Sequence, residues 1–324
     1  MDKIIIYSLF CSLAFFATDC SDGDKHSSND EPRGNLIQPE LYANVSTINS
    51  VSPLTGILEA YPCKENTSTY IGNYRNGSLN SIYASYQVSN GSTISGNNPV
   101  WLPIGTYNMI YWAVPKATVP IYEGMAENDP PISIGMNLAN TYRSLRLRSG
   151  SSGNYYPVFD YVFGTQKINI GKDKLNAALQ RVVAAVNVTI KNQNDSVFDS
   201  AIDSVWVTIG NISEKLDYYT ATASNPSKTV SFELTPTADR KQMISNMVNL
   251  FPSAATPPFQ LNILLSNNKV KTYQQNLSST LSAGTKVTLT LTLNGILSEE
   301  DETGHFEVTD WVEKSENIDV PPLQ

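Results

Sequence analysis

The sequence is poor in the residues on which most enzyme and metal sites depend. It contains two histidines, His26 and His305, and three cysteines. A histidine-rich metal site or a Ser-His-Asp triad would have to rest on His305 alone, because His26 lies in a polar N-terminal segment. This shortage argues against enzyme classes built on imidazole. We therefore expect no catalytic residue, no cofactor and no metal ion.

Positive charge is also scarce. Lys and Arg number 22 against 30 Asp and Glu, which gives a formal net charge of −8. A nucleic-acid partner is excluded on this ground, because phosphates are neutralised by clustered Lys and Arg. Only 16% of residues are charged, so hydroxyl and amide side chains supply most of the polarity. Together with 18 Gly, 18 Pro and 17 Tyr, this composition is typical of a solvated β-protein with many turns.

The first 19 residues have the pattern of a signal peptide. A short charged start precedes about 14 mostly apolar residues, a run too short for a membrane-spanning helix. Cys20 follows directly, as in a lipobox, where the thiol receives a diacylglycerol before cleavage. Asp19 departs from the small residue usual at its position. The sequence predicts that Cys20 is lipidated and holds the protein on the cell outer membrane; the alternative is an ordinary signal peptide with an incidental Cys20.

The remaining cysteines agree with an exported lipoprotein that has no internal disulfide. Cys11 would leave with the signal peptide, and Cys20 would carry lipid, so that Cys63 remains alone. No histidine lies near Cys63 in the sequence, and a plain β-strand cysteine is favoured over a nucleophile. The polar residues 21–35 are interpreted as a tether between the lipid and the folded part.

Short β-prone runs separated by Gly-containing turns fill both halves of the chain. They predict an all-β fold with two tandem antiparallel β-sandwich domains, at 36–164 and 165–324, after the signal peptide at 1–19 and the lipid-anchored tether at 20–35. The segments 180–192 and 285–294 alternate most regularly. One helix is expected, at 238–250, with Thr237 as its cap. The segment 172–179 is compatible with a helical turn or with a strand.

Several short segments follow one another in a distinctive order. They are the lipobox-like Cys20, Leu-Pro-Ile-Gly-Thr-Tyr at 102–107 with Tyr-Trp at 111–112, Leu-Gln-Arg-Val-Val-Ala-Ala-Val at 179–186, Leu-Phe-Pro-Ser at 250–253, Leu-Ser-Ala-Gly at 281–284 and Val-Thr-Asp-Trp at 308–311. Together they resemble the Bacteroidetes fimbrillin superfamily, the lipoprotein pilins and fimbrial anchor or tip subunits. The Leu-Pro-x-Gly-Thr-Tyr segment is most similar to the minor anchor-type subunits.

This resemblance implies two transthyretin-like sandwiches and assembly by donor-strand exchange, in which a strand of one subunit fills the open sheet of another. The partners would be other fimbrial subunits, with a host or bacterial surface ligand as a further candidate. The expected function is a structural subunit of a cell-surface fimbria, an anchor or accessory subunit. The alternatives are a stalk or tip fimbrillin, or a surface lipoprotein that binds glycan or protein outside any fibre. The candidate strands for donation are 306–324 and 36–48.

Family members are trimmed by an arginine-specific protease, and Arg33 in the exposed tether is the candidate cleavage site. The alternative, favoured equally, is that Arg33 is only a solvated charge. Neither Lys nor Arg occurs between Gly34 and Pro62. A cut after Arg75 is expected to remove two strands. A subunit that keeps its first strand, such as an anchor, is therefore favoured over a trimmed stalk pilin.

Three Asp-Ser-aliphatic triplets contain Ser196, Ser200 and Ser204 and resemble a short bacterial O-glycosylation signal, although Asp and Ser are also ordinary turn residues. The nearby aspartates and Asp160 lack the spacing of a calcium loop. The aromatic residues of the strand patterns are expected in the core rather than in a sugar site. They are Trp101, Tyr107, Tyr111, Trp112 and Trp206.

Overall fold

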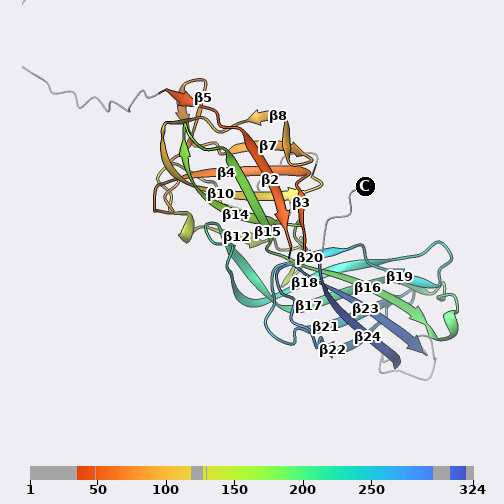
Figure 1. Cartoon of the computed structure of the whole chain (residues 1–324). Helices are drawn as coiled ribbons and strands as arrows, with labels where there is room; N and C mark the ends of the chain where they lie inside the picture. Colours follow the sequence, from red (N-terminus) through yellow and green to blue (C-terminus); the bar gives the residue numbers. More distant parts are fainter. Residues whose placement is uncertain (1–34, 48, 118–126, 129, 295–306, 319–324) are drawn as a thin grey trace, which may run out of the picture. The chain divides into compact units, whose positions relative to one another are not determined.

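The computed structural model describes residues 35–47, 49–117, 127–128, 130–294 and 307–318, and these form almost only β-strands (Figure 1). The exceptions are two single-turn 3-10 helices, η1 (Leu138–Asn140) and η2 (Gln193–Asp195). The all-β prediction is confirmed. Within the described ranges, no helix has the length and apolar character needed to cross a membrane.

The first sheet is closed by the chain's own N-terminal strand. Its strands, in order, are β15 (Leu175–Arg181), β14 (Val162–Ile170), β10 (Gly105–Pro115), β4 (Gly56–Lys64), β7 (Ala84–Ser89), β8 (Ser92–Asn98), β2 (Leu41–Ser46) and β3 (Val51–Pro53). A further, parallel pairing joins β15 to β2, so the sheet encloses its own hydrophobic core. Two small pairs adjoin it, β1 (Leu36–Ile37) with β9 (Leu102–Pro103) and β5 (Asn73–Arg75) with β6 (Ser78–Asn80).

The second sheet folds in a sandwich-like arrangement over a second core, to which β4 and β10 of the first sheet also contribute. Its main path runs through β11 (Glu127–Asn128), β12 (Tyr142–Leu145), β17 (Ile202–Asp217), β18 (Ala223–Pro236), β19 (Gln242–Ile244), β16 (Ala184–Asn192), β23 (Thr285–Asn294) and β24 (Glu307–Asn317). The strands off this path are β13 (Asn154–Tyr155), β20 (Val248–Leu250), β21 (Pro258–Leu265) and β22 (Val270–Asn276).

The chain does not change sheets at residue 165. That residue lies inside β14, which pairs with β10 along nine residues, and β15 also stays in the first sheet. The change falls at residues 182–183, before β16. In the other direction, β11 and β12 come from the first half but pair with each other and, through β12, with β17. The division into two domains at 165 stays a prediction.

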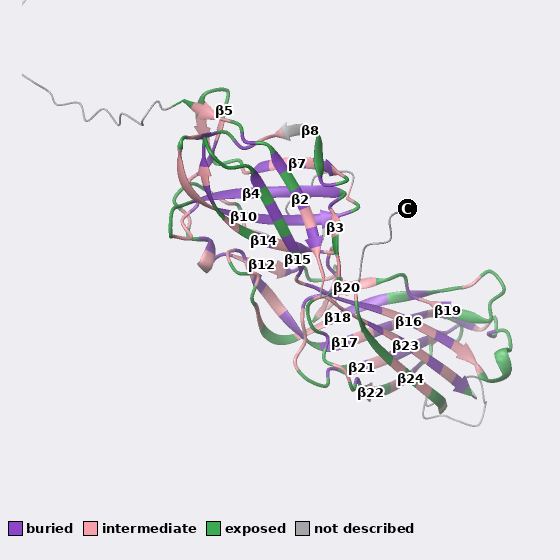
Figure 2. Cartoon of the chain, in the orientation of Figure 1, coloured by how far each residue is buried: buried purple, intermediate pink, exposed green. Residues whose placement is uncertain are grey.

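From Met109 to Pro115, strand β10 is buried on both faces, which explains the unbroken apolar sequence of this part (Figure 2). Met109 and Tyr111 belong to the core inside the closed sheet. Ile110 and Trp112 belong to the second core, together with side chains of β16, β17 and β23. A strand that is half-buried alternates between apolar and polar residues, whereas one enclosed on both sides has no polar face.

A buried arginine lies in the second core, between strands of both sheets. Arg143 on β12 is 1% exposed, and its Nη2 lies 3.6 Å from Oε2 of Glu59 on β4. The guanidinium carbon lies 4.2 Å from the ring centre of Tyr161, 4.9 Å from that of Trp112 and 5.2 Å from that of Tyr218. Arg143 also donates a hydrogen bond of 2.9 Å to the Tyr218 hydroxyl. We call these five residues the arginine cage.

The predicted helix at 238–250 is wrong. Thr237, its expected cap, instead closes a turn: its hydroxyl accepts from the Gln242 amide at 3.1 Å, and its amide donates to the Gln242 carbonyl at 2.8 Å. The residues after the turn form β19 and β20, which both pair with β16. Pairing with a buried strand outweighs the small differences in helix propensity, which amount to less than about 1 kcal/mol per residue. The undecided segment 172–179 becomes strand from Leu175 onward.

Candidate assembly site

The last strand, β24, is a long edge strand that pairs only with β23 among the described residues. It runs for 11 residues, and most of them are exposed (Figure 2). Ten of its residues face a β23 partner, from Asn294 opposite Glu307 to Thr285 opposite Asn317. The strand ends before Pro321 and Pro322, which lack the amide hydrogen that a β-ladder requires. β24 is therefore held mainly by backbone hydrogen bonds along one side.

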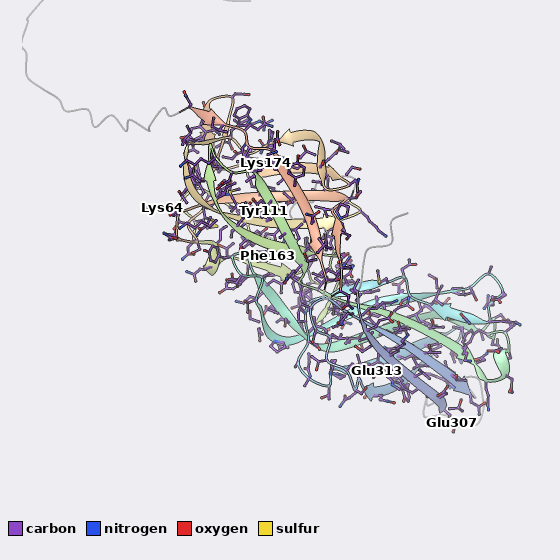
Figure 3. All side chains as sticks on the ribbon, viewed as in Figure 1. Lys64, Tyr111, Phe163, Lys174, Glu307 and Glu313 are labelled. Atoms are coloured by element: carbon purple, nitrogen blue, oxygen red, sulfur yellow. The ribbon has the colours of Figure 1, made fainter. Side chains whose placement is uncertain are left out.

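Two side chains fasten β24 to the rest of the fold. The Trp311 ring packs edge-to-face on Phe259, with ring centres 5.1 Å apart. The carboxylate of Glu313, a residue labelled in Figure 3, accepts hydrogen bonds from the amides of Ser278 at 2.9 Å and Ser279 at 2.6 Å. Partial burial raises the pKa of Glu313, but these hydrogen bonds outweigh burial and leave the pKa below its ordinary value. The sequence analysis did not identify Glu313, because its partners lie 34 and 35 residues away.

Strand β23, the neighbour of β24 in the sheet, could accept another strand in place of β24. Residues 287, 289, 291 and 293 of β23 are apolar and at most 1% exposed, while the residues between them are half-buried. On its other side β23 pairs in parallel with β16. If β24 detached, one edge of β23 would present an unpaired row of amide and carbonyl groups. Such an unpaired edge is a template for strand addition.

The other candidate donor, 36–48, is built into the closed sheet. Within it, β2 lies between β15 on one side and β3 and β8 on the other. Its side chains alternate, with Leu41, Ala43 and Val45 buried at 5% exposure or less. Removing β2 would take three buried residues out of the core of the first sheet, whereas β24 contributes only the half-buried Val308 and Trp311 to the second core. Residue 48 lies outside the described residues.

The candidate cleavage site Arg33 lies outside the described residues, so its prediction stays open. The next arginine, Arg75, is exposed at the turn between β5 and β6. A cut there would separate β1 to β5 from the rest, including the buried β4, so the expectation that it removes two strands is wrong. Trimming at Arg75 is incompatible with the first sheet.

Cys20 also lies outside the described residues, and its lipidation stays a prediction. Cys63 lies on a strand, β4, as expected, and it is fully buried there. Burial raises the pKa of its thiol to about 12, so the nucleophilic thiolate is not populated near neutral pH.

The three candidate glycosylation serines differ in their surroundings. Ser196 and Ser200 are exposed, whereas Ser204 is half-buried in β17, opposite Leu264. Within the described part of the chain, no three His, Cys, Asp or Glu side chains gather as a candidate metal site. Asp160 instead forms an ion pair with Arg181, whose Nε lies 2.9 Å from Oδ1 of Asp160.

The aromatic residues are distributed partly as expected. Tyr111 and Trp112 are fully buried, and Tyr107 and Trp206 are half-buried. Trp101 is 37% exposed, so its assignment to the core is wrong. It precedes the two-residue strand β9, which pairs only with β1 among the described residues.

Residues 28–317 match the family described as fimbrillin-A associated anchor proteins Mfa1 and Mfa2. The chain belongs to this family. It is a family of fimbrial anchor proteins and not of enzymes, and it associates the chain with cell-surface fimbriae and their subunits. The resemblance to the fimbrillin superfamily is thus confirmed.

Solved structures share the fold of this family member at low sequence identity. The fimbrial anchor protein Mfa2 of Porphyromonas gingivalis is 11% identical, with a TM-score of 0.51 over 86% of this chain and 97% of that one. A candidate cell adhesion protein of Bacteroides ovatus is 13% identical, with a TM-score of 0.50 over 87% and 98%. A candidate polysaccharide-binding protein of Bacteroides thetaiotaomicron is 13% identical, with a TM-score of 0.50 over 82% and 90%. No curated protein matches the sequence.

Proposed function

We propose that this protein is a lipid-anchored subunit that attaches a fimbria to the outer membrane and joins its neighbour by donating β24. The observation that carries the proposal is the contrast between the two terminal strands. β2 completes a closed core, whereas β24 lies exposed on a single edge. A chain that keeps its first strand does not need trimming in order to fold, which supports an anchor or accessory subunit over a trimmed stalk pilin.

Donation of β24 would combine two physical effects. The strand would exchange one ladder of backbone hydrogen bonds for another, so little enthalpy is lost in the exchange. The side chains at 308 and 311, which are the more buried ones of β24, would enter pockets of the neighbour's sheet. Both sandwiches would be of the transthyretin-like type that the family resemblance implies. Exposed Ser196 and Ser200 are the proposed sites of O-glycosylation, and Ser204 is a weaker candidate.

Tethering β24 to its own sheet tests strand donation directly. Thr290 and Val312 face each other in the β23–β24 ladder, and Val312 is 49% exposed. The double variant Thr290→Cys/Val312→Cys is expected to form a cross-strand disulfide under oxidising conditions. We expect the oxidised variant to lose most attachment of fimbriae, measured as fibres retained on cells after shearing, and the reduced variant to recover it.

Deleting 306–324 provides the second arm of this experiment. The truncated protein is expected to reach the cell surface but not to retain fibres. Wild-type retention by the oxidised disulfide variant, with the disulfide verified by mass spectrometry, would show that β24 is not donated. Buried Cys63 does not interfere with the new pair, because its side chain has no exposed surface.

The lipid anchor predicts a separate result. Cys20→Ala is expected to abolish labelling with radioactive palmitate and to move the protein from the outer-membrane fraction into the soluble fraction, because the acyl chains supply the membrane affinity. Substitution of Cys63 by Ala, at the buried cysteine, is the matched control and should retain the label. Palmitate incorporation that survives Cys20→Ala would contradict the lipobox assignment.

A further inference from the structure

One end of the closed sheet presents apolar side chains to solvent. Trp101 is 37% exposed and Ile104 is 60% exposed, and they flank β9 on either side. Single exposed apolar residues are common on protein surfaces, but these two are neighbours along one short segment. We call them, together with the cations described below, the end patch.

The backbone of the end patch is fixed in place. Asn73, itself 1% exposed, accepts a hydrogen bond of 2.8 Å from the Trp101 amide and donates one of 3.1 Å to the Pro99 carbonyl. The Trp101 carbonyl accepts from the Tyr74 amide at 3.1 Å. Ile104 packs beside Gly171, where a Cβ atom would lie 3.2 Å from its Cγ1. The two apolar side chains are therefore presented from a rigid base.

The strand register shows which end of the sheet this is. Gly105, at the start of β10, pairs with Ile170, whereas Pro115, at its finish, pairs with Gly56. Arg181, from which the chain passes to the second sheet, pairs with Val162 near that finish. The 11 residues of β10 separate the two ends by about 36 Å. The end patch therefore lies near the start of β10, at the end of the sheet opposite to the one where the chain continues into β16.

The N-terminal segment joins the fold beside the same patch. Leu36 and Ile37 of β1 pair with Pro103 and Leu102, the two residues between Trp101 and Ile104. Figure 1 labels β5, whose Tyr74 bonds Trp101, at this end of the sheet. If Cys20 carries lipid, the residues from 20 to 34 can extend at most about 50 Å. The attachment point on the fold is then restricted to within about 50 Å of the bilayer, so the end patch can reach the lipid.

Two cations flank the patch. Arg75 follows Tyr74, and Lys172 follows Gly171; both are exposed, and neither has an ion-pair partner among the described residues. In a chain of net charge −8, exposed cations beside tryptophan and isoleucine are distinctive. Tryptophan favours the membrane–water boundary, and Lys and Arg side chains extend from it toward anionic headgroups.

We infer that the end patch is a lipid-contact surface, on which the first sheet rests against the outer membrane with Trp101 and Ile104 at the headgroup level. This inference rests on the proposed lipid anchor and adds an orientation to it. A docked patch would fix the direction of the sheet relative to the bilayer, whereas a tether alone would leave the sheet free to rotate. The finish of β10, and the chain that continues from it, would then point away from the lipid.

Spin labels on the full chain test the inference. Ile104→Cys and Val312→Cys place one label in the end patch and one on β24, and Cys63 is buried in both. The lipidated protein is reconstituted into vesicles of phosphatidylethanolamine and phosphatidylglycerol, and flotation verifies its attachment. We expect the label at 104 to collide several-fold more with lipid-soluble oxygen, and several-fold less with a water-soluble nickel chelate, than the label at 312.

Any other outcome would contradict the inference, and the outcomes show whether the contact surface alone or also the lipid anchor is wrong. Equal chelate access at 104 and 312, in protein that floats with the vesicles, would leave the lipid anchor intact and remove the contact surface. Shielding of the label at 104 from both probes would indicate that a second copy of this chain, and not lipid, covers the patch, because the vesicles contain no other protein. Protein that fails to float would refute the lipid anchor and, with it, the inference. Ile104→Cys in detergent without vesicles is the reference for an uncovered patch.

Discussion

Arg143→Ala is expected to lower the free energy of unfolding by about 3–5 kcal/mol, the range found when one partner of a buried ion pair is removed. The substitution would leave the Glu59 carboxylate, which is 6% exposed, without its cation. It would also empty the space that the guanidinium occupies between Trp112, Tyr161 and Tyr218. Denaturant unfolding followed by tryptophan fluorescence measures the loss.

A hydrogen bond from Tyr61 helps to hold the Glu59 carboxylate of the arginine cage in its buried position. The Tyr61 hydroxyl donates to Oε2 of Glu59 at 2.9 Å. Burial, and then the charge of Glu59, raises the pKa of Tyr61 well above its ordinary value, so the phenol remains a donor. Tyr61 and Arg143 contact the same oxygen, Oε2, of Glu59, so the Tyr61 hydrogen bond still holds the carboxylate inside when Arg143 is removed.

Two control variants separate the buried pair from ordinary charge effects. Lys167→Ala removes an exposed ion pair, in which Nζ of Lys167 lies 2.9 Å from Oε1 of Glu65. This substitution should lower the free energy of unfolding by less than about 1 kcal/mol. Glu59→Gln combined with Arg143→Met removes both charges while keeping an acceptor for Tyr61, and it should recover much of the stability lost in Arg143→Ala. A loss in Arg143→Ala no larger than that in Lys167→Ala would contradict a stabilising cage.

Deletion of residues 36–48 is expected to prevent folding of the first sheet. β2 faces β15 through six residue pairs, and it contributes Leu41 and Val45 to the enclosed core. Burial of each of these side chains contributes about 1.5–3 kcal/mol, and each ladder hydrogen bond contributes about 0.5–1.5 kcal/mol. The combined loss is comparable with the roughly 5–15 kcal/mol by which domains are stable. Limited proteolysis and circular dichroism would detect the unfolded chain.

The matched comparison is deletion of 306–324, which should leave a folded, protease-resistant protein. The side chains of β24 are mostly exposed; its loss uncovers one edge of β23 and removes two apolar side chains, Val308 and Trp311, that pack against the second core from outside. If the 36–48 deletion folds as well as the 306–324 deletion, the contrast between a structural first strand and an exchangeable last strand fails. The proposed direction of strand donation would fail with it.

Several features of this protein follow from sequence alone because they depend on local patterns. The alternation in 285–294 predicts a strand with one buried face, and residues 287, 289, 291 and 293 are those buried. The strand pattern around Tyr111 and Trp112 predicts that both lie in the core, and both are fully buried in β10. The ordered short segments predict the fimbrial family, which residues 28–317 confirm. Period-two burial and turn residues are properties of neighbouring positions, so they need no knowledge of what packs against them.

Tertiary structure decided the features that depend on distant partners. The segment 238–250 has helical spacing but forms β19 and β20, because β16, about 50 residues earlier in the chain, supplies their hydrogen bonds. The closure of the first sheet needs β2 and β15, and the partners of Arg143 come from strands on both sides of it in the sequence. Trp101 occurs in the same apolar context as Trp112, yet only Trp112 has a second sheet packed over it. Burial and pairing between residues far apart in the chain are set by the three-dimensional path, and a pattern of adjacent residues carries no information about that path.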